Sequence, residues 1–242
     1  MPFYDQCHSE IRCEWGQRGV DVLARNSDVV IIVDVFSFST AVDVAVSRGA
    51  TILPYRWKDE SALEYAKSLH ADLVDVTRTK ERWSLSPASL ASVPCGARLV
   101  LPSANGATLS LSTGAVPTLA GCLRNAKAVA ESAQLLGKSI AIIPAGERWP
   151  DGSLRPAVED WIAAGAIIHY SHGTRSPEAA SATAAFSHSC SSLTECLRQC
   201  SSGRELLERG FESDVRYAAD LNISSTAPIL RNGGYIKFAS LP

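Results

Sequence analysis

The sequence contains no apolar run that approaches the roughly 20 residues needed to span a bilayer. It also lacks an excess of charge: charged residues make up 20% of the chain and the formal net charge is −2, which gives no reason to expect nucleic acid or an anionic membrane as a partner. Near its start there is no basic segment followed by an apolar one, so we expect no secretory signal. These absences predict a soluble cytoplasmic protein.

Several common site motifs are missing as well. The seven cysteines include no CxxC pair, and their odd number without an export signal indicates reduced thiols. Cys196 and Cys200 lie four residues apart, but no histidine stands at zinc-finger spacing. The five histidines form no HxH or HxxxH pair, so we interpret them as structural or surface residues, His169 and His172 included. A serine hydrolase of the G-x-S-x-G type is excluded too.

What the sequence does contain is an alternation of Val- and Ile-rich runs with amphipathic stretches. This alternation is typical of βαβ units and predicts an α/β fold with a mainly parallel sheet flanked by helices. We expect strands at 29–35, 51–55, 98–102 and 139–146, and helices at 39–48, 59–71, 107–112, 125–137 and 156–168.

From about residue 176 the pattern changes to Ala, Ser and Glu, which favours helices. We expect them near 177–188, 191–200, 203–209 and 213–221, followed by two short strands around the NGG turn in 228–238. Because no linker separates the two parts, we predict a single α/β domain over 1–242, with a helical part at about 176–242 packed on it.

The most apolar run of the chain ends in a carboxylate, Asp34. Ligands of open α/β sheets bind beyond the carboxyl ends of the strands, so Asp34 is a candidate metal ligand. It could equally cap the helix that begins near Ser39 and Thr40. Position alone does not decide between the two interpretations.

Two further segments leave expected strands with polar residues. Ser103, Asn105 and Gly106 form a strand–turn–helix junction whose amides could bind an anion, although NG is also a common turn. Glu159 and Asp160 lie in the first turn of a helix, where acids offset the helix dipole. Together with Glu147 they would crowd three carboxylates near one strand end, which favours a bound cation.

Taken in order, these segments resemble the 2-phosphosulfolactate phosphatases, magnesium-dependent α/β enzymes of coenzyme M biosynthesis. DVFSFST at 34–40 resembles the family's D-V-L-R-A-[ST]-[ST], and ANGA at 104–107 resembles its T-N-G-T turn. KER at 80–82 and LSP at 85–87 resemble G-E-R and N-S-P, and GCLRNA at 121–126 resembles G-S-x-x-N-A. EDWIAAG at 159–165 and GRELLERGFESDV at 203–215 match the remaining motifs.

The resemblance implies hydrolysis of a small polyanionic phosphate monoester, 2-phospho-3-sulfolactate, to 3-sulfolactate and phosphate with Mg²⁺. It implies catalytic roles for Asp34, Glu159 and Asp160, and metal binding by these three with Glu147. Substrate binding is expected from Arg82, Ser103, Asn105, Gly106, Arg124, Asn125 and Arg148.

The chain departs from the family pattern at several positions. Ser37 replaces the arginine of D-V-L-R, Ala104 and Ala107 replace threonines, and the glycine-rich loop after G-E-R is missing. A non-catalytic anion-binding or scaffold protein with the same fold is therefore the alternative. Haloacid-dehalogenase chemistry would need a second aspartate where this chain has Phe36. The sequence leaves open the true substrate, attack by water or carboxylate, and a homodimer.

Overall fold

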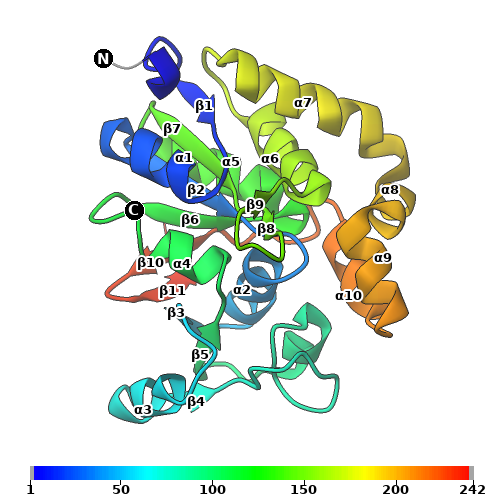
Figure 1. Cartoon of the computed structure of the whole chain (residues 1–242). Coiled ribbons are helices and arrows are strands. Elements are labelled where there is room, and N and C mark those ends of the chain that lie inside the picture. The colour runs from blue at the N-terminus through cyan, green and yellow to red at the C-terminus, as the bar shows by residue number, and fades with distance from the viewer. Residues whose placement is uncertain (1–2, 240–242) are drawn as a thin grey trace.

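The computed structural model describes residues 3–239, and its centre is one mixed sheet with the strand order β1-β7-β2-β6-β10-β11-β3-β5-β4 (Figure 1). Its first block is parallel throughout, because β7 pairs with β1 and β2, and β2 pairs with β6. The strands of this block are β1 (Ile11–Cys13), β7 (Ile140–Pro144), β2 (Val29–Val33) and β6 (Thr118–Gly121).

The second parallel block consists of β3 (Thr51–Tyr55), β5 (Arg98–Pro102) and β4 (Asp72–Leu73). The antiparallel hairpin of β10 (Pro228–Arg231) and β11 (Gly234–Lys237) separates the two blocks. The three successive antiparallel pairings make β3 and β5 run opposite to β6. The expected α/β class with a mainly parallel sheet is confirmed. The antiparallel pairings of the sheet all involve this hairpin.

Helices cover both faces of the first block because its strands are apolar on both sides. Side chains of Val29, Ile31 and Val33 pack against α5 (Ala126–Leu136) and α6 (Val158–Tyr170). The alternate residues Val30 and Ile32 pack on the opposite face against α1 (Gly16–Leu23) and the short α4 (Gly106–Ser110). Alternation of side chains along β2 thus places every one of its residues in the core.

The second block is covered by α2 (Phe38–Ser47) on one face and by α3 (Ser61–Ser68) on the other. Phe38 of α2 packs edge-on against Tyr235 of the hairpin, with ring centroids 5.8 Å apart. The chain between α6 and the hairpin forms α7 (Pro177–Ser189), α8 (Leu193–Gln199), α9 (Ser201–Glu208) and α10 (Glu212–Ala219). The helical C-terminal part is therefore confirmed, and α7–α10 lie along one side of the molecule (Figure 1).

Most expected elements are found within a residue or two of their predicted bounds. Helix α3 (Ser61–Ser68) begins two residues after its expected start, and the Asp59 carboxylate accepts a hydrogen bond from the Ser61 amide. Helix α1, β6 and the short β1 and β4 were not predicted from the sequence. The three strands carry too few residues to show an alternating or sustained apolar pattern. In 3–239 no helix is long and apolar enough to cross a membrane.

Candidate active site

A cavity of about 390 Å³ lies where the segments after β2, β5 and β7 meet α9. Four cationic side chains line it, together with two carboxylates. The cations are Lys58, Arg78, Arg148 and Arg209, and the acids are Glu147 and Glu205. Ser37, Ser103 and Asn105 contribute polar groups. A cavity with this lining can bind a small ligand that carries several negative charges.

Asp34 follows β2 and is buried behind this lining. Its Oδ2 accepts a hydrogen bond from the backbone amide of Gly106 at 3.0 Å. Burial raises the pKa of Asp34, and the amides of Phe38 and Gly106 and the charges of Arg78 and Lys58 act in the opposite direction. The residue before α2 is Ser37, which makes no side-chain cap. Asp34 thus lies between the first residues of two helices, α2 and α4.

Asp160 connects two of the strand ends through its carboxylate. Its Oδ1 accepts from the amide of Val35 at 2.8 Å, and its Oδ2 accepts from the amide of Gly146 at 2.9 Å. Burial, followed by the charges of Asp34 and Glu159, raises its pKa well above the usual range. Since each oxygen already holds a backbone amide, this side chain positions the segments after β2 and β7.

Unlike Asp34 and Asp160, Glu147 reaches the cavity itself. It lies on a small hairpin of β8 (Glu147–Arg148) and β9 (Leu154–Arg155), and its Oε2 accepts from the Asn105 side-chain amide at 3.1 Å. Burial, with the charges of Asp34 and Glu159, raises the pKa of Glu147 to about 7. Glu159 itself is buried at the start of α6. The four carboxylates therefore act on one another electrostatically.

The donor set fits a hard divalent cation by its chemistry. Within 3–239 no group of three or more acidic, histidine or cysteine side chains is arranged to hold a metal ion. Burial raises the pKa values of Asp34, Glu147 and Asp160, and for Glu147 and Asp160 the charges of Asp34 and Glu159 raise them further. A bound cation would oppose both effects. Mg²⁺ prefers carboxylate oxygens and retains several waters, so it needs only one or two protein ligands.

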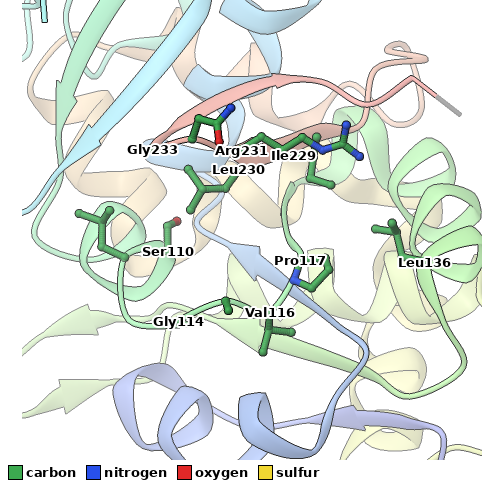
Figure 2. A pocket seen from close by; sticks show the side chains of 12 residues that line it. Ser110, Gly114, Val116, Pro117, Leu136, Ile229, Leu230, Arg231 and Gly233 are labelled. Atoms are coloured by element: carbon green, nitrogen blue, oxygen red, sulfur yellow. The ribbon is translucent and has the colours of Figure 1, made fainter. Parts of the chain in front are cut away.

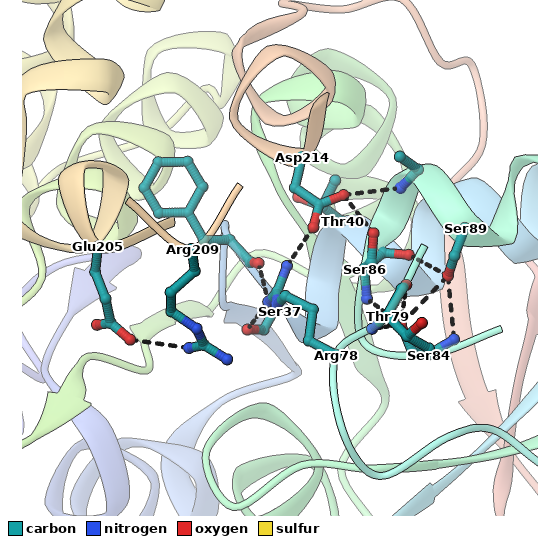
Figure 3. A network of polar contacts seen from close by, with 12 residues as sticks. Ser37, Thr40, Arg78, Thr79, Ser84, Ser86, Ser89, Glu205, Arg209 and Asp214 are labelled. Carbon is teal, nitrogen blue, oxygen red and sulfur yellow. Dashed lines mark hydrogen bonds and ion pairs between the residues drawn. The ribbon is translucent and has the colours of Figure 1, made fainter. Parts of the chain in front are cut away.

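Arg78 is the cation most deeply placed in the cavity wall. Its side chain is 9% exposed and pairs with the fully buried Asp214 of α10 at 2.5 Å. Its other terminal nitrogen donates to the carbonyl oxygen of Phe36 at 2.7 Å and to the hydroxyl of Ser37 at 2.9 Å (Figure 3). Where the family motif has an arginine, this chain has a serine whose hydroxyl accepts from an arginine of another segment.

The structure does not bring all sequence-predicted substrate residues to this cavity. Ser103, Asn105 and Arg148 line it. Arg82 lines a different cavity beside β4, is 79% exposed and pairs with Asp75. The Gly106 amide is occupied by Asp34.

Arg124 and Asn125 serve internal contacts instead. Arg124 pairs with Asp43 at 3.0 Å and with Asp220 at 3.2 Å, and it lies over the ring of Tyr217. Asn125 is fully buried, and its side chain bonds the Cys122 amide and the Ala120 carbonyl oxygen. Both residues fix the chain around the start of α5.

Three of the cations that line the cavity were not predicted from the sequence: Lys58, Arg78 and Arg209. Arg78 had a signal, since it lies in the polar segment that also carries the KER motif at 80–82. Lys58 lies just after β3, and partial desolvation lowers its pKa while the charge of Asp34 opposes this. Arg209 belongs to the helical part and had no such signal.

A larger cavity of about 470 Å³ lies at the far end of the hairpin (Figure 2). Its lining includes Ser110, Val116, Pro117, Leu136 and the turn residues 229–233. Arg231 is its single charged residue, and no carboxylate lines it. It offers little chemistry, so the smaller cavity beside Asp34 is the candidate active site.

Comparison with known proteins places the chain in a family. The family model of 2-phosphosulpholactate phosphatase matches residues 21–233. The 2-phosphosulfolactate phosphatase of Methanothermobacter thermautotrophicus is 31% identical over 213 residues, covering 86% of this chain and 88% of that protein. A probable 2-phosphosulfolactate phosphatase of Thermosynechococcus vestitus is 27% identical over 233 residues, covering 83% and 88%.

The chain belongs to the 2-phosphosulfolactate phosphatase family, whose members are hydrolases. The resemblance drawn from the sequence motifs is thereby confirmed.

Proposed function

We propose that this protein is a magnesium-dependent phosphatase that hydrolyses a small polyanionic phosphate monoester. The observation that carries the proposal is the lining of one cavity by four cationic side chains beside a group of mutually repelling carboxylates. Phosphoryl transfer requires positioning and neutralisation of negative charge more than covalent chemistry by the protein. Four cations and the carboxylates beside them would meet that requirement.

We propose 2-phospho-3-sulfolactate as the substrate, with 3-sulfolactate and phosphate as products. This molecule carries a phosphate, a sulfonate and a carboxylate, so its recognition needs several cationic donors. Lys58, Arg78, Arg148 and Arg209 supply them. The printed name of the 31% identical archaeal relative supports the same choice. Such a role places the protein in coenzyme M biosynthesis.

The acidic residues divide into two roles. Glu147 reaches the cavity and, with Asp34 and Glu159 behind it, would hold Mg²⁺, which when bound supplies neutralisation of the phosphoryl oxygens. Asp160 positions the segments after β2 and β7 through its two amide contacts. Asn105, the residue before α4, orients Glu147 through its side-chain amide. We place this activity in the cytoplasm, where the seven free thiols are stable.

Phosphate release from a panel of small phosphate monoesters, with and without magnesium, tests the proposal. We expect release that depends on magnesium, and a higher kcat/KM for esters with two further anionic groups than for those with none. A protein that binds such esters without releasing phosphate would instead be the non-catalytic anion-binding alternative. Equal turnover with magnesium and with excess chelator would remove the metal from the proposal.

A further inference from the structure

The cations of the candidate site differ in how firmly they are held. Lys58, Arg148 and Arg209 are exposed, whereas the Arg78 side chain is 9% exposed. Arg209 pairs with the exposed Glu205 on its own helix, and Arg148 donates to the Gly152 carbonyl oxygen of its own loop. Arg78 alone among the four makes three hydrogen bonds, to two separate segments of the chain, Phe36–Ser37 and Asp214. An anion that meets Arg78 therefore meets a fixed, largely desolvated charge.

Asp214 fixes one end of the Arg78 guanidinium. Its Oδ2 pairs with Arg78, and its Oδ1 accepts from the Ser86 hydroxyl at 2.6 Å and from the Ala88 amide at 3.2 Å. Because the carboxylate is fully buried and satisfied on both oxygens, it has little freedom to turn. Figure 3 shows Arg78 between Asp214 on α10 and Ser37 after β2.

The segment that carries Arg78 is itself held by serine hydroxyls. Ser84 is fully buried; its hydroxyl accepts from the Thr79 and Ser86 amides and donates to the Thr79 carbonyl oxygen. The Ser89 hydroxyl accepts from the Ser84 amide. The short connection between Arg78 and Ser86, which replaces the family's glycine-rich loop, is therefore internally braced. Bracing lowers the entropy lost when the arginine binds a ligand.

The guanidinium still has donors to offer. Three hydrogen bonds to protein account for three of the five N–H groups that an arginine carries. Arg78 lines the cavity, so the remaining N–H groups are available to a bound anion. A planar guanidinium can grip two oxygens of a phosphate or sulfonate, which a lysine ammonium cannot do with the same geometry.

We infer that Arg78 is an anion-binding, specificity-determining residue of this cavity, and that Asp214 is its positioning residue. Arg78 takes a tetrahedral oxyanion, the phosphate or sulfonate of the substrate, on the wall formed by Ser37 and the segment 77–86. The inference rests on the proposed function for its substrate, but the anion contact can be measured without turnover.

Binding of inorganic phosphate, measured by calorimetry with magnesium in the buffer, tests Arg78 directly. We expect Arg78→Lys to keep the charge but to weaken phosphate binding by about tenfold to a hundredfold, the loss typical of a charged hydrogen bond. The matched control is Arg82→Lys in the same segment, since Arg82 is exposed and lines another cavity. Arg82→Lys should leave phosphate affinity unchanged.

Removal of Arg78 alone would leave Asp214 buried without its partner, so folding must be kept separate from binding. The double variant Arg78→Gln/Asp214→Asn removes both charges and retains an oxygen for the Ser86 and Ala88 donors. We expect it to fold, as seen by thermal unfolding, and to bind phosphate as weakly as Arg78→Lys or more weakly. Asp214→Asn alone should raise KM with little loss of kcat, at a temperature where the variant is folded.

The possible outcomes separate the two proposals. If the wild type releases no phosphate from any ester while Arg78→Lys still loses phosphate binding, the proposed function fails and the inference stands. If Arg78→Lys and the folded double variant bind phosphate as the wild type does, the inference is overturned even where turnover is seen. A wild type that binds no phosphate would overturn it as well.

Discussion

The Asp34 carboxylate accepts a hydrogen bond of 3.0 Å from the backbone amide of Gly106, a residue 72 positions further along the chain. This contact joins the end of β2 to the start of α4, after β5, although β5 runs opposite to β2 within the sheet. This hydrogen bond therefore helps to hold the carboxylate beside the turn that carries Asn105.

Asp34→Asn tests whether this carboxylate acts on a metal. The substitution removes the charge and keeps the shape, and its amide oxygen can still accept from Gly106. We expect weaker magnesium affinity and a loss of turnover by about 100-fold or more, because the phosphoryl group tolerates little misplacement of charge. Phosphate release across a magnesium titration is the measurement, with thermal unfolding as the control for folding. Unchanged activity at equal stability would restrict Asp34 to holding the start of α4.

Gly106→Ala should disturb the same contact by steric means. A Cβ at this position would lie 2.5–2.6 Å from side-chain atoms of Phe38, so the start of α4 has to move away from α2. We expect a loss of about 1–3 kcal/mol in the free energy of unfolding, together with reduced turnover.

Urea unfolding measures the effect of Gly106→Ala. At Gly114 an added Cβ meets no atom within 4 Å, so Gly114→Ala reports the cost of its positive φ of 70° alone. If Gly106→Ala is as stable as the wild type, the Phe38 side chain can move aside without lowering the free energy of unfolding.

Asp160→Asn should destabilise the fold. An asparagine has one carbonyl oxygen, so either the Val35 amide or the Gly146 amide would face an NH₂ group instead of an acceptor. We expect a cost of about 1–3 kcal/mol in the free energy of unfolding, the penalty of a buried unsatisfied donor. Asp21→Asn, at an exposed position, should change stability by less than about 0.5 kcal/mol. Equal stability of the two variants would contradict the positioning role.

The raised pKa of Glu147 predicts a specific dependence of stability on pH. Its pKa lies at about 7 in the folded protein, against an ordinary value of 4.5. Between these two values the folded state binds a proton that the unfolded state has lost, so the stabilisation is complete below 4.5 and is lost as pH rises through about 7. Without magnesium, stability should therefore fall over this window.

The contribution of Glu147 is the difference between the wild type and Glu147→Gln, measured by denaturant unfolding from pH 4 to pH 8. The stability difference between the two proteins should change across the window and become constant above it. Saturating magnesium should flatten the wild-type curve, because a bound cation stabilises the ionised carboxylate. Parallel curves for the two proteins without magnesium would refute the assignment.

Much of the fold was readable from local patterns. The continuous Val and Ile run at 29–33 predicted a strand buried on both faces, and β2 lies between β7 and β6 with helices on either side. The position of Asp34 at the end of that run pointed to the edge of the sheet where the candidate site lies. The order of the motifs identified the family, because each motif lies within a few consecutive residues.

The tertiary structure alone decided which charged side chains meet. Arg82 and Arg78 stand four residues apart in one polar segment, yet Arg78 lines the cavity while Arg82 pairs with Asp75 elsewhere. Arg124 pairs internally with Asp43, 81 positions away, and Arg78 pairs with Asp214, 136 positions away. Backbone periodicity is set by neighbouring residues and is visible in the sequence. The partner of a long, flexible arginine depends on distant segments that only the packed chain brings within reach.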